Sequence, residues 1–186
     1  LLELVRGLNG DPDVDGIMVQ LPLPAHLDEQ AIVEAIAPCK DVDGLHPVNT
    51  VALTTNQPKV VPCTVRGIEY LLAQTDLSTC GAKVAVLGRG SLVGLPTDLL
   101  LGGRMHNAEI KVVHRGVSDI TRALVSAEII IAAAGCAGLV SADRVQAGAV
   151  VIDIGMSWPN GALAGDVSPE VENVAGWMTP PNTSFG

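Results

Sequence analysis

Hydrophobic residues in the first third of the chain follow a helical spacing in three places and form one short continuous run. Apolar positions three and four residues apart predict amphipathic helices, and a short apolar run bounded by turn residues predicts a buried strand. The expected elements are a helix over residues 1–8, a strand over 16–19, a helix from Asp28 to about 37, a long irregular loop over 41–62, and a helix over 65–73 capped by Thr64.

The pattern then becomes more regular, with strand-length apolar runs alternating with short helical segments. Repeated β–α units predict a parallel sheet with helices on both faces. The expected strands cover 83–87, 110–113, 128–134 and 149–154, and the expected helices cover 92–101 with Pro96 in its first turn, 118–126 with Ser118 as cap, and 141–146.

The predicted fold class is therefore α/β, with two α/β domains and a cleft between them, the second domain being a Rossmann-type parallel sheet flanked by helices. Residues 1–75 form the first domain, residues 76–165 the second, and residues 166–186 a C-terminal segment that returns towards the first. The helical spacing is already present at Leu1, without an initiating Met, and we expect a chain that is truncated at both ends.

Composition narrows the functions that this fold can serve. Hydrophobic residues make up 48% of the chain and aromatic residues only 2%, so aliphatic side chains must form the core. A net charge of −9 argues against nucleic-acid and anionic-membrane partners, and an anionic ligand would need a local cluster of positive charge. Four scattered cysteines without a Cys-x-x-Cys pair favour reduced thiols, a cytoplasmic location and no metal site.

Two polar side chains are expected at the mouth of the first strand. Gln20 follows the run 16–19 directly, and two prolines then force the chain out of any sheet. Asp43, held before Gly44, is a second polar group that could reach the same place. Open α/β sheets bind ligands at the carboxyl ends of their strands, so the pair indicates a binding site. The plainer alternatives are a solvated loop amide and a turn aspartate.

A glycine-rich loop lies between a predicted strand and a predicted helix, with the sequence Gly88-Arg89-Gly90-Ser91-Leu92-Val93-Gly94. A glycine turn that leads into a helix N-terminus can hold a phosphate, because free N–H groups and the helix dipole face the anion. The third glycine comes one residue later than in the usual G-x-G-x-x-G pattern, and a simple tight turn is the alternative.

The end of the next strand distinguishes between dinucleotides. NAD sites usually carry an acidic residue there for the ribose 2′-hydroxyl, whereas this chain has Val113-His114-Arg115-Gly116. Arg89, His114 and Arg115 together suit a 2′-phosphate, so we predict NADP rather than NAD as the cofactor. The alternative for Arg115 is a solvated loop residue.

These motifs together resemble the bifunctional methylenetetrahydrofolate dehydrogenase/methenyltetrahydrofolate cyclohydrolase family, the FolD type, over nearly the whole chain. The matching segments are residues 19–24, 40–47, 62–64, 88–94, 151–155 and 165–167, of which the first two are the most specific. The resemblance implies oxidation of 5,10-methylenetetrahydrofolate by NADP⁺ and hydrolysis of the product to 10-formyltetrahydrofolate. It also implies a place in one-carbon metabolism and purine biosynthesis, and a homodimer.

The resemblance implies roles for individual residues. Gln20 corresponds to the amide that partners the family's catalytic lysine, Leu21 to a wall of the folate pocket, and Asp43 to the carboxylate that accepts hydrogen bonds from the pterin ring. The residues expected around the cofactor are Gly88, Arg89, Gly90 and Arg115 at the phosphates, Thr64, Ala133, Ile154 and Met156 around the ribose and nicotinamide, and Val93 and His114 in the same site.

Two features depart from the family's pattern. The family's catalytic lysine lies in a Tyr-x-x-x-Lys motif upstream of Gln20, and the 186 residues contain no such motif. The family's Pro-Gly-Gly-Val-Gly-Pro loop is replaced by Thr179-Pro180-Pro181 and the residues that follow. We therefore expect little or no cyclohydrolase activity from this chain alone.

Three alternatives remain open at this point. One is another NADP-dependent dehydrogenase of two domains, which would leave the Gln-Leu-Pro-Leu-Pro segment unexplained. The others are a non-catalytic NADP-binding module and a monofunctional dehydrogenase. No role is assigned to His26, His46 and His106, which have no partner visible in the sequence.

Overall fold

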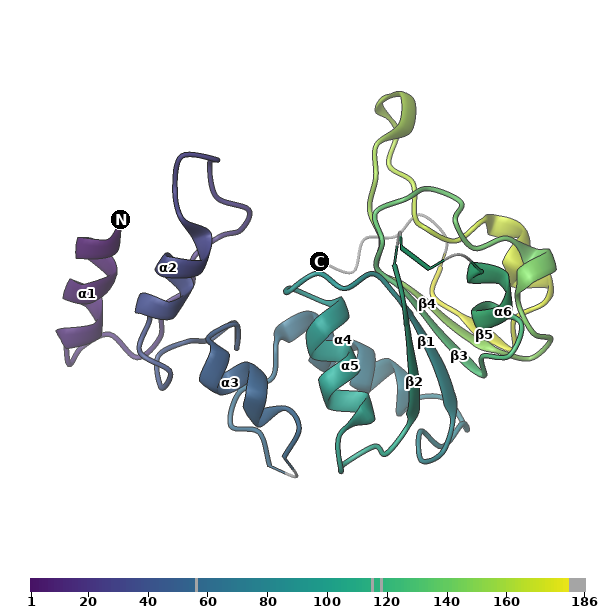
Figure 1. Cartoon of the computed structure of the whole chain (residues 1–186), viewed down its shortest axis with the longest axis horizontal. Coiled ribbons are helices and arrows are strands. Elements are labelled where there is room, and N and C mark those ends of the chain that lie inside the picture. The colour runs from purple at the N-terminus through teal and green to yellow at the C-terminus, as the bar shows by residue number, and fades with distance from the viewer. Residues whose placement is uncertain (56, 115, 118, 181–186) are drawn as a thin grey trace.

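A computed structural model describes residues 1–55, 57–114, 116, 117 and 119–180 of the chain. The helices before the sheet are α1 (Leu2–Gly10), α2 (Glu29–Ala35), α3 (Pro47–Ala52) and α4 (Cys63–Leu72). Figure 1 shows α1 and α2 at one end of the molecule, α3 in the middle, and α4 beside the sheet. These four helices thus follow one another along the long axis of the molecule in chain order.

Five parallel strands form the sheet at the other end of the molecule. They are β1 (Lys83–Leu87), β2 (Glu109–Val113), β3 (Ile129–Ala132), β4 (Val150–Asp153) and β5 (Trp177–Met178), in the order β2-β1-β3-β4-β5. The helices that follow β1 and β2 are α5 (Gly94–Gly102) and α6 (Ile120–Leu124). The predicted α/β class and parallel sheet are confirmed. Strand β5 was not predicted, because two residues are too few to show a period.

Successive residues of the central strands face opposite sides of the sheet, as the pleat requires. Val84 and Val86 of β1 pack in one hydrophobic cluster with α4 and α5, whereas Ala85 and Leu87 pack in a second cluster with α6. Figure 1 shows α4 and α5 on one side of the sheet and α6 on the other. Because both faces are covered, these strands are apolar throughout rather than alternating.

The expected strand over 16–19 is wrong: these four residues make a single parallel bridge, between Ile17 and Asp41. The Ile17 N–H donates to the Lys40 carbonyl oxygen at 2.7 Å, and the pairing does not extend into a ladder. A run of apolar residues can form a strand only where a partner runs beside it for several residues, and here the partner turns away after Val42. A small hydrophobic cluster of Val5, Ile17 and Ile36 lies behind the bridge.

Side-chain hydrogen bonds supplement this small core. The Asn9 side chain donates to the Ala35 carbonyl at 2.7 Å and accepts from the Ala37 N–H at 2.8 Å, which joins α1 to the end of α2. The Lys40 ammonium donates to the carbonyls of Leu8 and Asp11 at 3.0 and 2.6 Å. Each of these carbonyls also accepts a backbone N–H at 3.3 Å, from Asp11 and Val14 respectively, so Lys40 adds a second bond to each and ties the end of α1 to the segment at 40.

Several predicted helix ends need correction. Residues 41–62 are not wholly irregular, because they contain α3. Thr64 does not cap α4: Pro62 occupies the N-cap position, so Thr64 is the second helical residue. Helix α6 begins at Ile120 and is capped by Asp119, whose carboxylate accepts from the Arg122 N–H; the predicted cap Ser118 lies outside the described residues. The helix predicted over 141–146 is a single 3₁₀ turn, η1 (Ala142–Arg144).

The C-terminal part of the described chain contains two further 3₁₀ turns. The turn η2 (Pro159–Gly161) lies in a loop whose ends pair through Ser157 and Ala164, and this loop projects from the sheet in Figure 1. The turn η3 (Pro169–Asn173) buries Val171 against the α6 side of the sheet.

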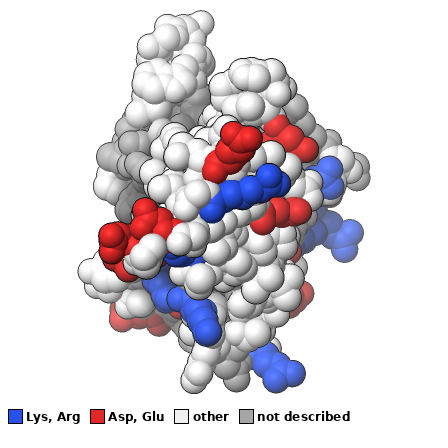
Figure 2. Space-filling model, turned by 90° about the vertical axis from the view of Figure 1, so that its left-hand side faces the viewer, with Lys and Arg blue, Asp and Glu red and all other residues white. Residues whose placement is uncertain are grey.

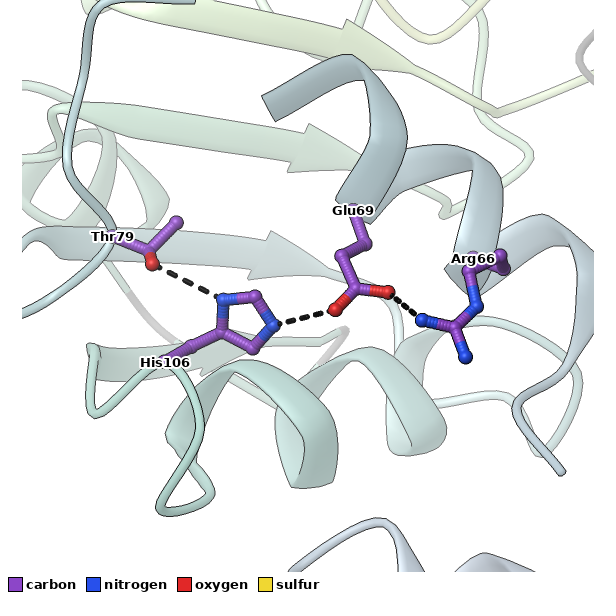
Figure 3. A network of polar contacts seen from close by, with 4 residues as sticks. All are labelled: Arg66, Glu69, Thr79 and His106. Atoms are coloured by element: carbon purple, nitrogen blue, oxygen red, sulfur yellow. Dashed lines mark hydrogen bonds and ion pairs between the residues drawn. The ribbon is translucent and has the colours of Figure 1, made fainter. Parts of the chain in front are cut away.

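His106 has partners that the sequence did not reveal. Its Nε2 lies 3.0 Å from Glu69 Oε1 and its Nδ1 lies 3.1 Å from Thr79 Oγ1, while Arg66 contacts the other carboxylate oxygen of Glu69 (Figure 3). This network joins α4 to the turns that precede β1 and β2. His46 also has a local role, because its Nδ1 accepts from the Val48 N–H at the start of α3.

The cysteines and most of the charged side chains lie at the surface of the molecule. On the N-terminal end of the molecule, Figure 2 shows acidic and basic side chains interspersed. All four cysteines are free and exposed. Within the described part of the chain, no helix is long and apolar enough to cross a membrane.

Candidate functional site

We call the part of the chain before α4, residues 1–62, the N-terminal region. A cavity of about 440 Å³ opens between this region and the sheet, and we name it the inter-region cavity. Side chains from the segment after the bridge, the start of α4, the glycine loop and the end of β4 line it. Seven residues predicted for the site lie there: Gln20, Leu21, Asp43, Thr64, Val93, Ile154 and Met156. They come from positions up to 136 residues apart (156 − 20), so the fold brings them together.

A second cavity of about 520 Å³, the glycine-loop cavity, lies at the carboxyl ends of β1, β2 and β3. It is lined by five more of the predicted residues: Gly88, Arg89, Gly90, His114 and Ala133. The remaining predicted residue, Arg115, lies outside the described residues.

The glycine loop needs its glycines for steric reasons at two positions. Gly88 has a φ of +106°, and a Cβ there would lie 2.3 Å from the Ala133 carbonyl oxygen. A Cβ on Gly94 would lie 2.4 Å from the Gly88 carbonyl oxygen. Around Gly90, by contrast, a Cβ would meet no atom within 4 Å, so the loop leaves open space on its outer side. Helix α5 begins directly after it, at Gly94, so the N-terminal end of the helix dipole lies at this part of the structure. In its first turn the Leu95 N–H already donates to the Gly90 carbonyl at 3.0 Å, and Pro96 has no N–H.

Gln20 is exposed at the edge of the inter-region cavity. Its amide Nε2 donates to the Leu21 carbonyl at 3.2 Å. Among the described residues this is the one hydrogen bond of the Gln20 side chain, and it leaves the amide oxygen and one amide hydrogen for a ligand. Leu21 and Met18 add apolar surface beside it.

Asp43 is a half-buried carboxyl that lines the same cavity. Burial raises the pKa of Asp43, and the neighbouring Asp41 carboxylate raises it further. A carboxyl group with a raised pKa exchanges its proton closer to neutral pH than an exposed aspartate does. It can therefore accept hydrogen bonds from a ligand and take part in proton exchange.

Asp41, to which the sequence analysis gave no role, shapes the loop that carries Asp43. It is 3% exposed, and its carboxylate accepts from the Gly44 N–H at 3.0 Å, the His46 N–H at 2.8 Å and the Asn49 Nδ2 at 2.9 Å. Gly44, at φ +68°, packs against Pro62. The signal available in the sequence was an aspartate three residues before a glycine, a common turn pattern.

Asp153 and Asp166 are two further residues that the sequence analysis quoted in motifs without assigning a role. Asp153 accepts from the N–H groups of Gly155, Asp166 and Val167 at 3.0–3.1 Å. Burial raises the pKa of Asp153, and the Asp166 carboxylate adds to this, although hydrogen bonds from Val167, Asp166 and Gly155 oppose it. Asp166 in turn accepts from three successive N–H groups of the loop after β3.

The arrangement suits a ligand that extends across the ends of several strands. The glycine-loop cavity offers a phosphate-binding turn beside Arg89 and His114. The inter-region cavity offers an amide, a carboxyl of raised pKa and apolar walls. Such a pair of cavities can hold the phosphates of a dinucleotide in one, and its other end beside a polar heterocycle in the other.

Two family profiles match the chain. The profile described as the NAD(P)-binding domain of tetrahydrofolate dehydrogenase/cyclohydrolase matches residues 62–186. The profile described as the catalytic domain of tetrahydrofolate dehydrogenase/cyclohydrolase matches residues 1–43.

Solved structures give the same result. A bifunctional FolD enzyme, methylenetetrahydrofolate dehydrogenase/cyclohydrolase from Campylobacter jejuni, is 36% identical, with a TM-score of 0.89 over 96% of this chain and 64% of that chain. The Trypanosoma brucei enzyme, solved with NADP cofactor and an inhibitor, is 36% identical, with a TM-score of 0.88 over 97% of this chain and 65% of that chain. The chain thus spans just under two thirds of the length of these relatives. An NAD-dependent enzyme from Saccharomyces cerevisiae, 20% identical with a TM-score of 0.68, shares the fold.

Proposed function

The chain belongs to the tetrahydrofolate dehydrogenase/cyclohydrolase family, and we propose that it oxidises 5,10-methylenetetrahydrofolate to 5,10-methenyltetrahydrofolate with NADP⁺. One observation carries this proposal: the inter-region cavity joins Gln20 and Asp43 of the N-terminal region to Thr64, Ile154 and Met156 around the sheet. A folate and a nicotinamide must meet for hydride transfer, and this cavity has walls from both regions.

The dinucleotide fits the glycine-loop cavity. The turn at Gly88 and the open space at Gly90 leave room for the pyrophosphate beside the start of α5. We assign Arg89 and His114, together with Arg115, the next residue in the sequence, to the 2′-phosphate, because β2 ends without an acidic residue at Val113. Bound NADP⁺ supplies the hydride acceptor.

The folate side is assigned to the N-terminal region. Asp43 would hydrogen-bond the pterin ring, and its raised pKa suits a group that exchanges hydrogen bonds with ring nitrogens. Leu21 would pack against the folate, and Gln20 would orient its reacting end. Thr64, Ala133, Val93, Ile154 and Met156 would surround the ribose and nicotinamide.

The protein's contribution to hydride transfer is mainly orientation. Bound NADP⁺ would accept the hydride that the methylene carbon of the folate gives up as it becomes the methenyl cation, and the chain's residues would hold the two reactants for this transfer. Holding the two reacting carbons close together converts an encounter in solution into a step within one complex. Apolar side chains such as Leu21 and Ile154 keep water from the reacting carbons.

We propose in addition that the chain alone has little or no cyclohydrolase activity. Within these 186 residues the lysines are Lys40, Lys59, Lys83 and Lys111, and none precedes Gln20. Lys40, the nearest in sequence, binds the carbonyls of Leu8 and Asp11 rather than a group of the inter-region cavity. Hydrolysis of methenyltetrahydrofolate by the purified chain should match the rate in buffer; a rate well above it would contradict the proposal.

Titration with NADP⁺ and NAD⁺, followed by an assay with 5,10-methylenetetrahydrofolate, tests the main proposal. We expect NADP⁺ to bind about tenfold tighter or more, because a 2′-phosphate gains charge-assisted hydrogen bonds from arginine. Reduced cofactor should then appear only when the folate is added. Tighter binding of NAD⁺, or no reduction with either cofactor, would contradict it.

We further propose that residues 1–75 form the folate side, residues 76–165 the dinucleotide domain and residues 166–186 a returning segment, in a cytoplasmic homodimer. The five-stranded sheet of the described residues ends at β2, which leaves an edge of the dinucleotide domain for contact with a second copy. Light scattering of the purified chain should give twice the monomer mass of 19.2 kDa. A monomer at micromolar concentration would contradict the dimer.

A further inference from the structure

Three segments near the carboxyl ends of β3 and β4, residues 134–136, 153–155 and 165–167, are held together by two buried carboxylates. Asp166 is fully buried, and its Oδ2 accepts from the N–H groups of Ala134 and Gly135 at 2.6 and 3.1 Å, while Oδ1 accepts from Cys136 at 2.6 Å. Asp153, 6% exposed, accepts from Asp166 itself and from Val167. The loop after β3 therefore depends on a residue that is itself anchored from the end of β4.

Two glycines make this arrangement possible. A Cβ on Gly155 would lie 2.0 Å from the carboxyl carbon of Asp166, and a Cβ on Gly165 would lie 2.1 Å from a carboxylate oxygen of Asp153. Each carboxylate thus occupies the space that a side chain would need on the glycine beside the other aspartate. The Asp-x-Gly and Gly-Asp segments, ten residues apart in sequence (165 − 155), form one unit, which we name the carboxylate interlock (Asp153, Gly155, Gly165 and Asp166).

The carboxylate interlock affects both cavities by fixing the backbone segments that line them. Its own aspartate side chains are not among the lining residues of either cavity. The loop that Asp166 holds supplies Ala133, Ala134 and Cys136 to the glycine-loop cavity. The Ala133 carbonyl of that loop is the atom that lies against Gly88. On the other side, the segment that follows Asp153 supplies Ile154 and Met156 to the inter-region cavity.

Three successive N–H groups that converge on one point form a nest that binds anions. Here Asp166 fills the nest from within the protein, so the N–H groups of 134–136 cannot turn towards a bound phosphate. The loop is consequently fixed in one position before any ligand arrives, and preorganisation of this kind improves affinity by lowering the cost of ordering on binding.

We propose that Asp166 is a positioning residue for dinucleotide binding: its carboxylate fixes the loop 133–136 against the glycine loop, and through Asp153 it fixes this loop relative to Ile154. The inference rests on the proposed function, because it takes the ligand of the glycine-loop cavity to be NADP⁺. Asp166 touches no ligand in this scheme. It acts through the position of Ala133 and Cys136.

The test uses Asp166→Asn and Asp166→Ala in the full 186-residue chain, with Leu72→Ala as a control for general loss of stability. In Asp166→Asn, one amide oxygen can still accept from two of the three N–H groups, so this variant keeps the loop partly ordered. Leu72 is 3% exposed in the cluster on the other face of the sheet and lines neither site cavity. Thermal unfolding of each variant checks that it is folded.

We expect the Kd for NADP⁺ to rise about tenfold in Asp166→Ala and less in Asp166→Asn, because buried N–H groups are left without acceptors. The KM for NADP⁺ should rise in parallel, whereas the KM for the folate should change less than about twofold. Excess sodium formate, whose carboxylate can enter the emptied nest, should restore NADP⁺ binding to Asp166→Ala, and sodium chloride at equal ionic strength should not.

Three results would overturn the inference. One is unchanged NADP⁺ affinity in a folded Asp166 variant, and another is an equal loss of affinity in Leu72→Ala, which would mean that stability alone is responsible. If Asp166→Ala does not fold, the Kd of Asp166→Asn for NADP⁺ is compared with that of wild type instead, and an unchanged Kd overturns the inference. If the wild-type chain binds no NADP⁺, the proposed function fails and the inference fails with it; the wild-type titration separates this outcome from the others.

Discussion

The two sides of the cleft are built by different means. On the sheet side, strands β1, β3 and β4 are buried on both faces, and two hydrophobic clusters hold the ends of these strands in register. On the N-terminal side, a cluster of three buried residues and one bridge between Ile17 and Asp41 hold the segments that carry Gln20 and Asp43 in place. Both place polar groups at the same cavity.

Hydrogen bonds from side chains to backbone make up part of the difference. In the N-terminal region, Asn9, Lys40 and Asp41 together bond to carbonyl or N–H groups of six other residues. Such bonds are directional and individually weak, whereas apolar burial grows with area. The N-terminal side therefore depends on a few particular residues, and the sheet side depends on the total volume of its core.

The largest expected effect compares the same substitution in the two cores. Ile130→Ala, at the centre of β3 and fully buried, should lower the free energy of unfolding by about 4 kcal/mol. Ile17 is 5% exposed and is one of only three buried residues in its cluster, so Ile17→Ala should cost about 2 kcal/mol, because a thin core can relax into the space. Urea denaturation of both variants measures the difference. Equal losses would mean that the two regions are packed equally well.

The second prediction concerns the buried carboxylate of the N-terminal side. Asp41→Asn should lower stability by about 2 kcal/mol, because the amide cannot replace all three accepted hydrogen bonds. It should also raise the KM for the folate more than the KM for NADP⁺, since the loop that carries Asp43 is loosened. The Asp166 variants are expected to show the opposite pattern, in which the KM for NADP⁺ rises more than the KM for the folate. Equal changes in both KM values would show that the two sides are not held independently.

Sequence patterns predicted the sheet side well and the N-terminal side poorly. A strand such as β3, with four buried residues in succession, is visible as an apolar run whatever surrounds it. The run at 16–19 looks the same in sequence, but whether it becomes a strand depends on how far a distant partner follows it. The two-residue strand β5 and the short helix α3 carry too few residues for any period to appear.

For the site, motifs located the residues that line the cavities but not those that hold them. Gln20, Asp43 and the glycine loop stand out because glycine, proline and polar residues interrupt apolar runs. Asp166 accepts from backbone N–H groups up to 32 residues away, and nothing in local spacing reveals such partners. Asp41 bonds to nearby residues, but an aspartate three residues before a glycine is too common a pattern to single it out. The close approach of Asp166 to Gly155 is likewise a property of the folded chain alone.

The third prediction tests the polar tie between α1 and α2. Asn9→Ala should lower the free energy of unfolding by about 1.5 kcal/mol, because it removes a hydrogen bond to Ala35 and another from Ala37. Asn173→Ala is the matched control, since Asn173 makes one exposed bond to the Glu170 carbonyl at 3.3 Å on the sheet side. The control should change stability by less than about 0.5 kcal/mol. A control as costly as Asn9→Ala would remove the contrast between the two regions.

The smallest effect is the pH dependence that Asp43 gives to the N-terminal side. Burial and the Asp41 carboxylate raise the pKa of Asp43 in the folded chain, whereas in the unfolded chain it has the value of an ordinary aspartate. The contribution of this group to stability is therefore fully present below the unfolded pKa and is lost as the pH rises through the folded pKa. Asp43→Asn cannot ionise, so wild type should lose stability relative to this variant over that interval.

The size of this loss is limited because Asp43 is only half-buried and solvent screens its charge. Urea denaturation at a series of pH values gives the free energy of unfolding of wild type and of Asp43→Asn. The difference between the two isolates the effect of Asp43, since every other carboxyl group, Asp153 included, is present in both proteins. A difference that stays constant with pH, or that favours wild type as the pH rises, would contradict the raised pKa. The loss begins at the ordinary aspartate pKa and is complete once the pH has risen past the raised pKa of Asp43, so the difference should not change at higher pH. This plateau distinguishes Asp43 from any group that titrates later.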